Sequence, residues 1–316
     1  MQDEKGDKPK RLRSRRNERA SAASGSMRKA CCKIFAACMM AVPFQMAHAV
    51  IETDPADYVP LPPGTNLAVL YYQHAFRDST YHGGEQVNIP FRLETDIAIA
   101  RYVRYLSVAG FTVDVQAIVP FGSVRLSQPV SSVSNGAGDP FLGTVIWLLN
   151  DQKAQRYLAL GAFLGIPVGS YDSAKGAVNV GSNRWQGVFQ ISYGQPIYGN
   201  LAFDVTGEYA IYGANNDFAG LKYQQKPTYE LQTHLRYALT PLTTFGVSFY
   251  QTAGGRSTLG GVDQADRINT SRYLLTIQQI IVSPTLQLEA QFGQDIHVSS
   301  GPKEKYRVNL RLVKVF

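Results

Sequence analysis

The sequence predicts an all-β protein: a closed, antiparallel transmembrane β-barrel of about twelve strands, with short periplasmic turns and longer extracellular loops. Three observations point to this fold. The chain carries an export leader, the rest alternates apolar and polar residues with a period of two, and the connections between the alternating stretches are short and long in turn. A soluble β-sandwich would share the alternation, but it has no reason to keep its long loops after every second strand.

The leader occupies the first 49 residues. Residues 1–26 are polar and basic with almost nothing to bury, so we expect a disordered extension and a translation start at Met27. Residues 27–49 combine basic residues, a short apolar run and the small-residue site Ala47-His48-Ala49. This combination is typical of a signal peptide. We therefore expect export, with Val50 as the first residue of the mature chain.

The net charge and the cysteines lie in this leader. The whole sequence has 31 basic and 24 acidic residues, a net charge of +7, and residues 1–49 hold 11 basic and 4 acidic residues, which is also +7. The other 20 basic and 20 acidic residues cancel, so the mature chain gives no support to nucleic-acid binding. Because Cys31, Cys32 and Cys38 are all in the leader, the mature chain has no disulfide, thiolate metal site or cysteine nucleophile.

The mature chain divides into a short first segment and a barrel. Residues 50–65 are predicted as a periplasmic N-terminal segment, because Asp57–Thr65 is proline-rich and extended. Residues 66–316 are predicted as the barrel, since they lack an apolar run long enough for a transmembrane helix. The twelve predicted strands are Asn66–Phe76, Pro90–Tyr105, Ser107–Val119, Asp139–Leu149, Ala154–Ile166, Arg184–Pro196, Asn200–Gly213, Thr228–Leu239, Thr243–Thr252, Ser271–Val282, Thr285–Gln294 and Lys305–Phe316.

The connections support the same architecture. Short ones are expected at Leu148–Lys153, Gln195–Asn200, Thr240–Leu242 and Ser283-Pro284. An even number of strands returns both ends of the barrel to the periplasm, on the side of the short turns. The longer connections, expected outside the cell, are residues 77–89, 120–138, 167–183, 214–227, 253–270 and 296–304.

Each strand has an apolar and a polar face. In water the apolar faces would form a core, but export, loop asymmetry and the last strand favour a barrel whose apolar face meets lipid and whose charges line a lumen. Glu289 and Arg311 are predicted to lie opposite each other across the last two strands. These charges either neutralise the interior or line a solute path. The candidate lumen-lining residues are Arg92, Glu94, Asp96, Asp114, Asp204, Glu208, Glu230, His234, Arg236, Arg272, Glu289, Arg307 and Arg311.

The last strand ends on an aromatic residue. Tyr306, Val308, Leu310 and Leu312 alternate with polar residues, and the strand closes on Phe316. A terminal aromatic on the apolar face resembles the strand by which the barrel-assembly machinery recognises outer-membrane proteins, so Phe316 is the candidate assembly signal. Lys314 interrupts the apolar face, but its ammonium can reach the membrane interface.

Four short stretches carry a family resemblance: Asp57–Thr65, Gly136–Pro140, Gly165–Tyr171 and Arg311–Phe316. They resemble the family called "putative meta-pathway of phenol degradation", and the similarity covers nearly all of the mature chain. The resemblance implies an outer-membrane barrel of a Gram-negative bacterium, associated with uptake of aromatic or other hydrophobic compounds. The expected function is passive passage of small solutes, aromatic ones among them. The expected partners are outer-membrane lipid, the assembly machinery and the solute.

Two alternatives stay open. Some outer-membrane barrels are hydrolases, and His234 and Ser248 lie on the polar faces of adjacent predicted strands, with Glu230 as the nearest orienting group. The other alternative is a structural or adhesive surface protein that acts through its long loops. No two of the mature histidines are spaced as ligands on one element, so neither a metal nor another cofactor is expected, and the preferred interpretation assigns no catalytic residue.

Overall fold

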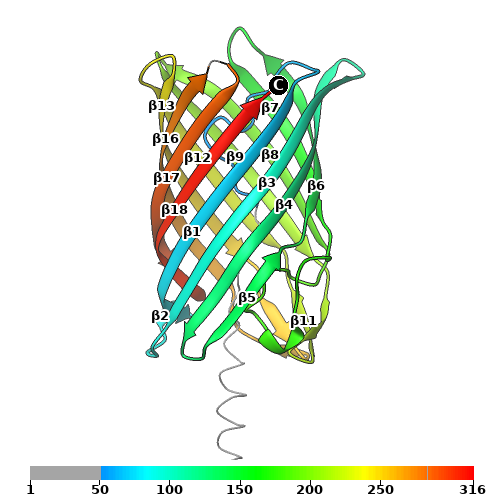
Figure 1. Cartoon of the computed structure of the whole chain (residues 1–316), viewed down its shortest axis with the longest axis vertical. Helices are drawn as coiled ribbons and strands as arrows, with labels where there is room; N and C mark the ends of the chain where they lie inside the picture. The colour runs from blue at the N-terminus through cyan, green and yellow to red at the C-terminus, as the bar shows by residue number, and fades with distance from the viewer. Residues whose placement is uncertain (1–50, 283) are drawn as a thin grey trace, which may run out of the picture. The chain divides into compact units, whose positions relative to one another are not determined.

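The protein is a barrel of long, tilted strands (Figure 1). The structure is a computed structural model that describes residues 51–282 and 284–316. The predicted extension and signal peptide, residues 1–26 and 27–49, lie outside the described residues. The barrel strands are β1 (Asn66–His82), β3 (Arg92–Val108), β4 (Phe111–Gln128), β6 (Phe141–Asp151), β7 (Arg156–Gly165), β8 (Gln186–Tyr198), β9 (Leu201–Tyr212), β12 (Thr228–Ala238), β13 (Thr243–Gly254), β16 (Ile268–Val282), β17 (Leu286–Val298) and β18 (Gly301–Val315).

The barrel is closed by its first and last strands. Strands β1 and β18 pair antiparallel over most of their lengths, from Leu67 opposite Val315 to Tyr81 opposite Gly301. In the part of the chain that the structure describes, the main sheet has 14 strands, and without the short β2 (Glu85–Gln86) and β5 (Ser132–Ala137) twelve remain. All of them pair with their neighbours in sequence order, which confirms the predicted antiparallel barrel of twelve strands.

Tight turns connect the strands at one end. Between β3 and β4 the turn is Ala109-Gly110, with φ of 50° and 84° at the two residues. Two central residues with positive φ match the twist of a hairpin, and glycine adopts this conformation without strain. The predicted break between Tyr105 and Ser107 is therefore wrong, because β3 continues to Val108. The C-terminus lies at this end, opposite to β2, β5 and β11 (Figure 1).

The long connections at the other end are partly sheet. The predicted loop at residues 120–138 is a hairpin in which β4 continues to Gln128 and pairs with β5. A separate four-stranded sheet joins two other long loops, the connection between β9 and β12 and the connection between β13 and β16. Their backbone groups thus bond to each other instead of to water. The strands are β10 (Asn215–Phe218), β11 (Leu221–Gln225), β14 (Ser257–Leu259) and β15 (Val262–Asp263). A 3₁₀ turn, η1 (Ser173–Lys175), is bonded to the turn after β10, where Ala219 N–H donates to the carbonyl oxygen of Ser173 at 2.9 Å.

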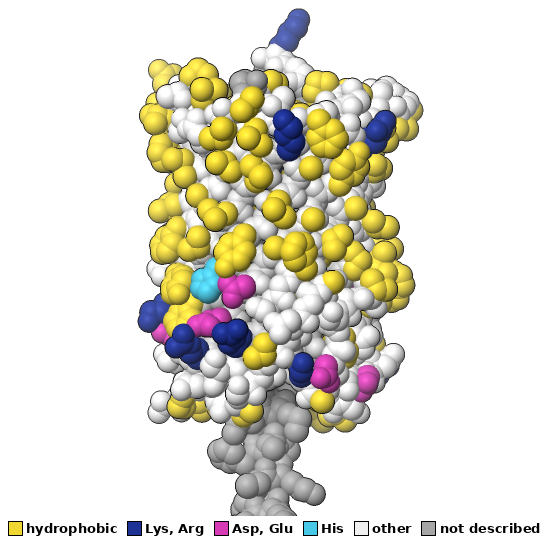
Figure 2. Space-filling view, in the orientation of Figure 1, with side chains coloured by type: hydrophobic (Ala, Val, Ile, Leu, Met, Phe, Trp, Pro, Cys, Tyr) yellow, Lys and Arg dark blue, Asp and Glu magenta, His cyan; other side chains and the backbone are white. Residues whose placement is uncertain are grey.

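The side chains are distributed inside out relative to a soluble protein. Large apolar residues on the outer face are about half exposed, whereas charged and amide residues on the inner face are buried. Figure 2 shows apolar side chains spread over the barrel wall. Such an outer face suits contact with acyl chains. None of the helices among the described residues has the length and apolar character to span a membrane. Outward residues include Leu70, Val115, Leu142, Leu164, Phe189, Ile191, Leu231, Val247, Leu275, Leu288 and Leu310.

The prediction that Arg92, Glu94 and Asp96 line the lumen is wrong. They lie on the outer face of β3, where the hydroxyl of Tyr72 (43% exposed) donates to Oδ1 of Asp96 at 2.7 Å. The alternate residue Leu93, 1% exposed, points inward instead. The alternation is inverted because the inner wall at β3 is apolar, so the charged residues take the outer face near the long-loop end. Figure 2 shows acidic, basic and histidine side chains there.

Candidate functional site: a segment inside the lumen

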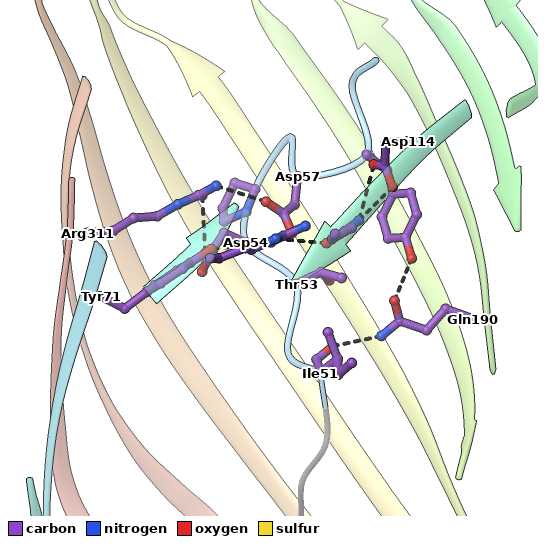
Figure 3. A network of polar contacts seen from close by, with 12 residues as sticks. Ile51, Thr53, Asp54, Asp57, Tyr71, Asp114, Gln190 and Arg311 are labelled. Atoms are coloured by element: carbon purple, nitrogen blue, oxygen red, sulfur yellow. Dashed lines mark hydrogen bonds and ion pairs between the residues drawn. The ribbon is translucent and has the colours of Figure 1, made fainter. Parts of the chain in front are cut away.

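Residues 51–61, here called the luminal segment, run through the inside of the barrel (Figure 3). Three wall residues donate hydrogen bonds to its backbone carbonyls: Tyr250 to Thr53 at 3.0 Å, Gln278 to Pro55 at 3.0 Å and Trp147 to Tyr58 at 2.9 Å. These contacts come from the neighbouring strands β13 and β16 and from β6, which is far from them in the strand order. The prediction of a periplasmic location is therefore wrong for residues 51–61. The proline-rich composition indicated an extended chain, but composition does not indicate whether such a chain lies in the periplasm or inside the barrel.

One wall of the lumen is apolar. A buried cluster lines the inner faces of β3 and β6–β9, and apolar residues of the luminal segment pack against it. Burial of these faces stabilises the segment in place. The wall residues are Val103, Tyr105, Phe141, Val145, Trp147, Tyr157, Ala159, Phe163, Val188 and Ala210, and the segment contributes Ile51, Tyr58, Val59 and Leu61.

The opposite wall is charged, and it binds the acidic residues of the same segment. Glu52 pairs with Arg272, and its other oxygen lies 2.9 Å from Nη1 of Arg307. Arg311 pairs with Asp54 at 3.1 Å and with Asp57 at 2.9 Å. The segment is therefore amphipathic, with its carboxylates toward β16 and β18.

Asp57 is held from two sides, because Arg101 on β3 binds its second oxygen at 3.0 Å. Burial alone would raise the pKa of Asp57, but the guanidinium groups of Arg101 and Arg311 outweigh it and hold that pKa below its ordinary value. The same balance applies to Glu52: burial raises its pKa, whereas Arg272 and Arg307 bring it below the ordinary value. Both carboxylates therefore stay ionised and paired at neutral pH.

Thr53 is fixed by three polar groups. Its backbone N–H and its hydroxyl both donate to Oε1 of Gln232 at 2.7 Å, and the hydroxyl lies 2.9 Å from Nε2 of His234. Gln232 is 0% exposed and His234 is 1% exposed, so the segment fills the lumen at this level. Buried amides with complete hydrogen bonds favour one defined position of the segment.

The predicted pair across the last two strands is confirmed. Glu289 lies directly opposite Arg311, and Arg311 Nη1 is 3.6 Å from the carboxylate. Most other predicted lumen residues also face inward, but several contact the luminal segment or each other instead of an open path: Arg236, for example, pairs with Asp204, which accepts a hydrogen bond from Ala56 N–H. The inward residues are Asp114, Asp204, Glu208, Glu230, His234, Arg236, Arg272, Glu289, Arg307 and Arg311.

Several charged residues of this site were not predicted from the sequence. Arg101 was not predicted because the inner and outer faces of β3 were assigned the wrong way round. The acidic residues of the luminal segment were not predicted because the segment was expected in the periplasm. Glu304 is buried beside Arg77 and Arg307, although its spacing from Arg307 breaks the alternation. The pairing of β1 and β18 shifts register near Arg77, and this irregularity places Glu304 inward, opposite Arg77.

The predicted histidine–serine contact is present, but the predicted orienting group is not. His234 Nδ1 lies 2.8 Å from Ser248 Oγ, and the two residues are opposite each other on β12 and β13. Glu230 instead accepts a hydrogen bond from Thr252 at 2.6 Å. The second nitrogen of His234 faces Thr53, so no carboxylate completes a triad.

A second apolar cluster lies toward the long-loop end. It joins inner residues of β3 and β4 to the connection between β7 and β8. Its members are Phe91, Leu93, Val124, Leu126 and Val178, with Val180 packed against them. Strands β3 and β4 also contribute Val103, Tyr105 and Ile118 to the apolar wall beside the luminal segment, so the two clusters share this side of the barrel.

Comparison with known proteins identifies the family of this barrel. A family model described as "Putative MetA-pathway of phenol degradation" matches residues 75–312. The chain belongs to this family. A solved structure titled as the COG4313 outer membrane channel from Pseudomonas putida F1 is 32% identical, with a TM-score of 0.80, and the match covers 84% of this chain and 100% of that one. This member of the phenol-degradation family is thus a porin-like barrel of the Gram-negative outer membrane.

Fold similarity extends further. The β domain of the Bordetella autotransporter BrkA is 9% identical, with a TM-score of 0.52, and the match covers 81% of this chain and 100% of that one. At this level of identity the similarity shows a shared fold alone. No match was found among the curated proteins. The family, outer-membrane and barrel predictions from the sequence are confirmed.

Proposed function

We propose that the barrel is a passive uptake channel for small apolar solutes, aromatic compounds among them, and that the luminal segment is its closure. The observation that carries this proposal is the apolar wall. Inner apolar residues of β3 and β4 belong both to the cluster at the long-loop end and to the cluster beside the luminal segment, with the inward Arg101 of β3 between them. An apolar solute that leaves water gains free energy along such a wall, and the charged wall opposite is occupied by ion pairs with the segment.

The family supports the nature of the solute. Its description refers to phenol degradation, and the similar protein of Pseudomonas putida is an outer membrane channel. Phenol is small, flat and mostly apolar with one polar group, which suits a lumen with one apolar and one polar wall.

Passage through the lumen requires the luminal segment to move. Tyr250 and His234 are each 1% exposed and Ser248 is 0% exposed, so the segment leaves no open path beside them. Short segments held by a limited set of contacts open locally at lower free energy than the strands that surround them. The proposal is therefore a channel that is closed at rest and opens when the segment leaves its ion pairs.

Uptake of labelled phenol at low concentration tests this proposal, in cells with matched amounts of each variant in the outer membrane. Val124→Asn places an amide on the apolar wall, and loss of about 0.8 kcal/mol of favourable apolar contact corresponds to roughly fourfold slower uptake. Thr276→Asn on the charged side is the matched control, since Val124 and Thr276 are both 3% exposed. Equal uptake by both variants would reject the apolar path.

We further propose that the barrel is not a hydrolase. The solved structure with 32% identity is an outer membrane channel, and His234 and Ser248 are covered by the luminal segment, where a substrate carbonyl could not reach them. Their hydrogen bond positions the imidazole against Thr53. The adhesive alternative stays a prediction, tested by binding of the barrel to surfaces with and without its long loops.

A further inference from the structure

Two glutamates face each other inside the barrel without a basic partner. Glu208 on β9 and Glu230 on β12 are directly opposite in the strand register, and each is 5% exposed. None of the ion pairs formed among the described residues includes either of them. Like charges directly opposite on neighbouring strands are destabilising, and more so when buried.

Each carboxylate also has one oxygen without a partner. Gln190 donates to Oε2 of Glu208 at 2.7 Å, and Thr252 donates to Oε2 of Glu230 at 2.6 Å. Oε1 of Glu208 and Oε1 of Glu230 are buried and have no hydrogen-bond partner. Buried carboxylate oxygens without donors are costly, so this arrangement points to a cationic group that supplies N–H donors.

The beginning of the luminal segment lies at this pair. Gln190 Nε2 contacts both Glu208 and the carbonyl oxygen of Ile51, at 2.7 Å in each case. The backbone amide of Ile51 also interacts with the Glu208 carboxylate. Ile51 is therefore fixed against the acidic pair by its own backbone.

The sequence supplies the cation. Ala47-His48-Ala49 is the predicted cleavage site, so the first residue of the mature chain is Val50, next to Ile51. Hydrolysis of the Ala49–Val50 peptide bond consumes one water and leaves a carboxylate on Ala49 and an α-ammonium on Val50. Consecutive Cα atoms are about 3.8 Å apart, so this new charge cannot lie far from Ile51.

We propose that Glu208 and Glu230 form a binding site for the α-ammonium group of Val50, created when the signal peptide is removed. Three N–H donors and one positive charge satisfy both unpartnered oxygens and relieve the repulsion between the two carboxylates. Removal of the leader therefore completes the set of ion pairs that holds the luminal segment. The charges of Glu52, Arg272 and Arg307 also act on Glu230. Both arginines, however, already form ion pairs with Glu52.

Chemical labelling of the mature N-terminus tests this site. Purified folded barrel is treated with an amine-reactive reagent at about pH 7.5, where a free α-amino group is partly neutral, and modification of Val50 is followed by peptide mass spectrometry. Pairing with two carboxylates stabilises the charged, unreactive form. Wild type is therefore expected to react about six- to eightfold more slowly than the Glu208→Gln/Glu230→Gln double variant, which is the effect at this pH of a one-unit rise in the pKa of the Val50 amino group.

Two controls accompany the test. Asp114→Asn neutralises a buried luminal carboxylate on β4 that accepts from Gln116 and from the Val145 N–H, and it should leave the Val50 rate unchanged. Exposed Lys314 should react equally in every sample. If the double variant does not fold, one alanine inserted before Val50 shifts the ammonium by up to about 3.8 Å and should speed its modification in the same way.

Three results would overturn the proposal. One is equal reactivity of Val50 in wild type and in the double glutamine variant. Another is slow modification that persists after the alanine insertion. The third is a mature N-terminus that begins at a residue other than Val50.

Discussion

Arg311 Nη2 lies 2.9 Å from Oδ1 of Asp57, which joins the last barrel strand to a segment more than 250 residues earlier in the chain. Nη1 of the same guanidinium lies 3.1 Å from Asp54 and 3.6 Å from Glu289. One arginine thus holds two carboxylates of the luminal segment and one of the barrel wall.

Arg311→Met is expected to release the luminal segment. Removal of one partner from a buried ion pair leaves unpaired charge and costs on the order of 3–5 kcal/mol. The expected result is a higher open probability in planar bilayers and a lower temperature for conversion of the barrel to its unfolded electrophoretic form. Arg156→Met is the control, because Arg156 forms an exposed pair with Asp151 that contributes little. Unchanged conductance in Arg311→Met would show that this contact does not hold the segment.

A cross-link between the segment and the wall should close the channel. The mature chain has no cysteine, so Thr53→Cys and Gln232→Cys introduce the only two thiols. Thr53 and Gln232 are in hydrogen-bond contact, and a short cleavable thiol cross-linker can therefore bridge them. Phenol uptake should fall to the level of cells without the barrel and recover on cleavage. Uptake that continues after complete cross-linking, with Thr53→Cys alone as the reference, would place the route elsewhere.

The residues that were predicted correctly from the sequence share one property: their strands are polar inside and apolar outside. Glu289 and Arg311 follow this rule, and the period of two was sufficient to place them opposite each other. On β3 the rule fails, because Leu93 and Val103 form the apolar wall and Asp96 lies outside. Alternation reveals two faces, but only the surroundings decide which of them points inward.

The luminal segment could not be located from its own sequence. Glu52, Asp54 and Asp57 are ordinary solvent-exposed residues in an isolated extended chain. Their partners Arg272, Arg307 and Arg311 are more than 200 positions away. Only closure of the barrel brings the two sets together, and no local pattern encodes that contact.

The closure of the channel should depend on pH in two opposite ways. Glu52 and Asp57 have pKa values below their ordinary 4.5 and 3.8, so they stabilise the docked segment above those values and lose that effect as the pH falls through the lowered pKa values. Burial and the neighbouring Glu289 carboxylate raise the pKa of Asp54 well above its ordinary value. Docking that involves Asp54 therefore strengthens as the pH falls through this raised pKa toward the ordinary value of 3.8.

Asp54→Asn separates these two effects. The variant should be more firmly closed at neutral pH than wild type and should lose the strengthening in mild acid, but it should still open below about pH 4. Conductance measured as a function of pH checks both parts. Wild type that opens steadily from neutral pH downward would contradict the assigned role of Asp54.

Ser248→Ala should leave no enzymatic defect. Ser248 is 0% exposed and its hydroxyl contacts His234, so its loss removes one buried hydrogen bond and is expected to cost about 1–3 kcal/mol of stability. Ester and phospholipid hydrolysis by purified barrel should be indistinguishable from background in wild type and variant. A measurable activity in wild type that the substitution abolishes would restore the hydrolase hypothesis.

Phe316→Ala should impair assembly without impairing the closed barrel. The side chain is 61% exposed, whereas the backbone of Phe316 donates to and accepts from Asn66 at 3.0 and 2.8 Å. Alanine retains both backbone bonds, so refolding of the purified protein into lipid should be nearly unchanged. The prediction that the assembly machinery reads the terminal aromatic requires the amount of folded barrel in the outer membrane of living cells to fall. Phe245→Ala, at an outward aromatic that is 46% exposed, controls for loss of lipid contact. Equal losses in cells and in purified lipid would show that Phe316 acts on stability and not on recognition.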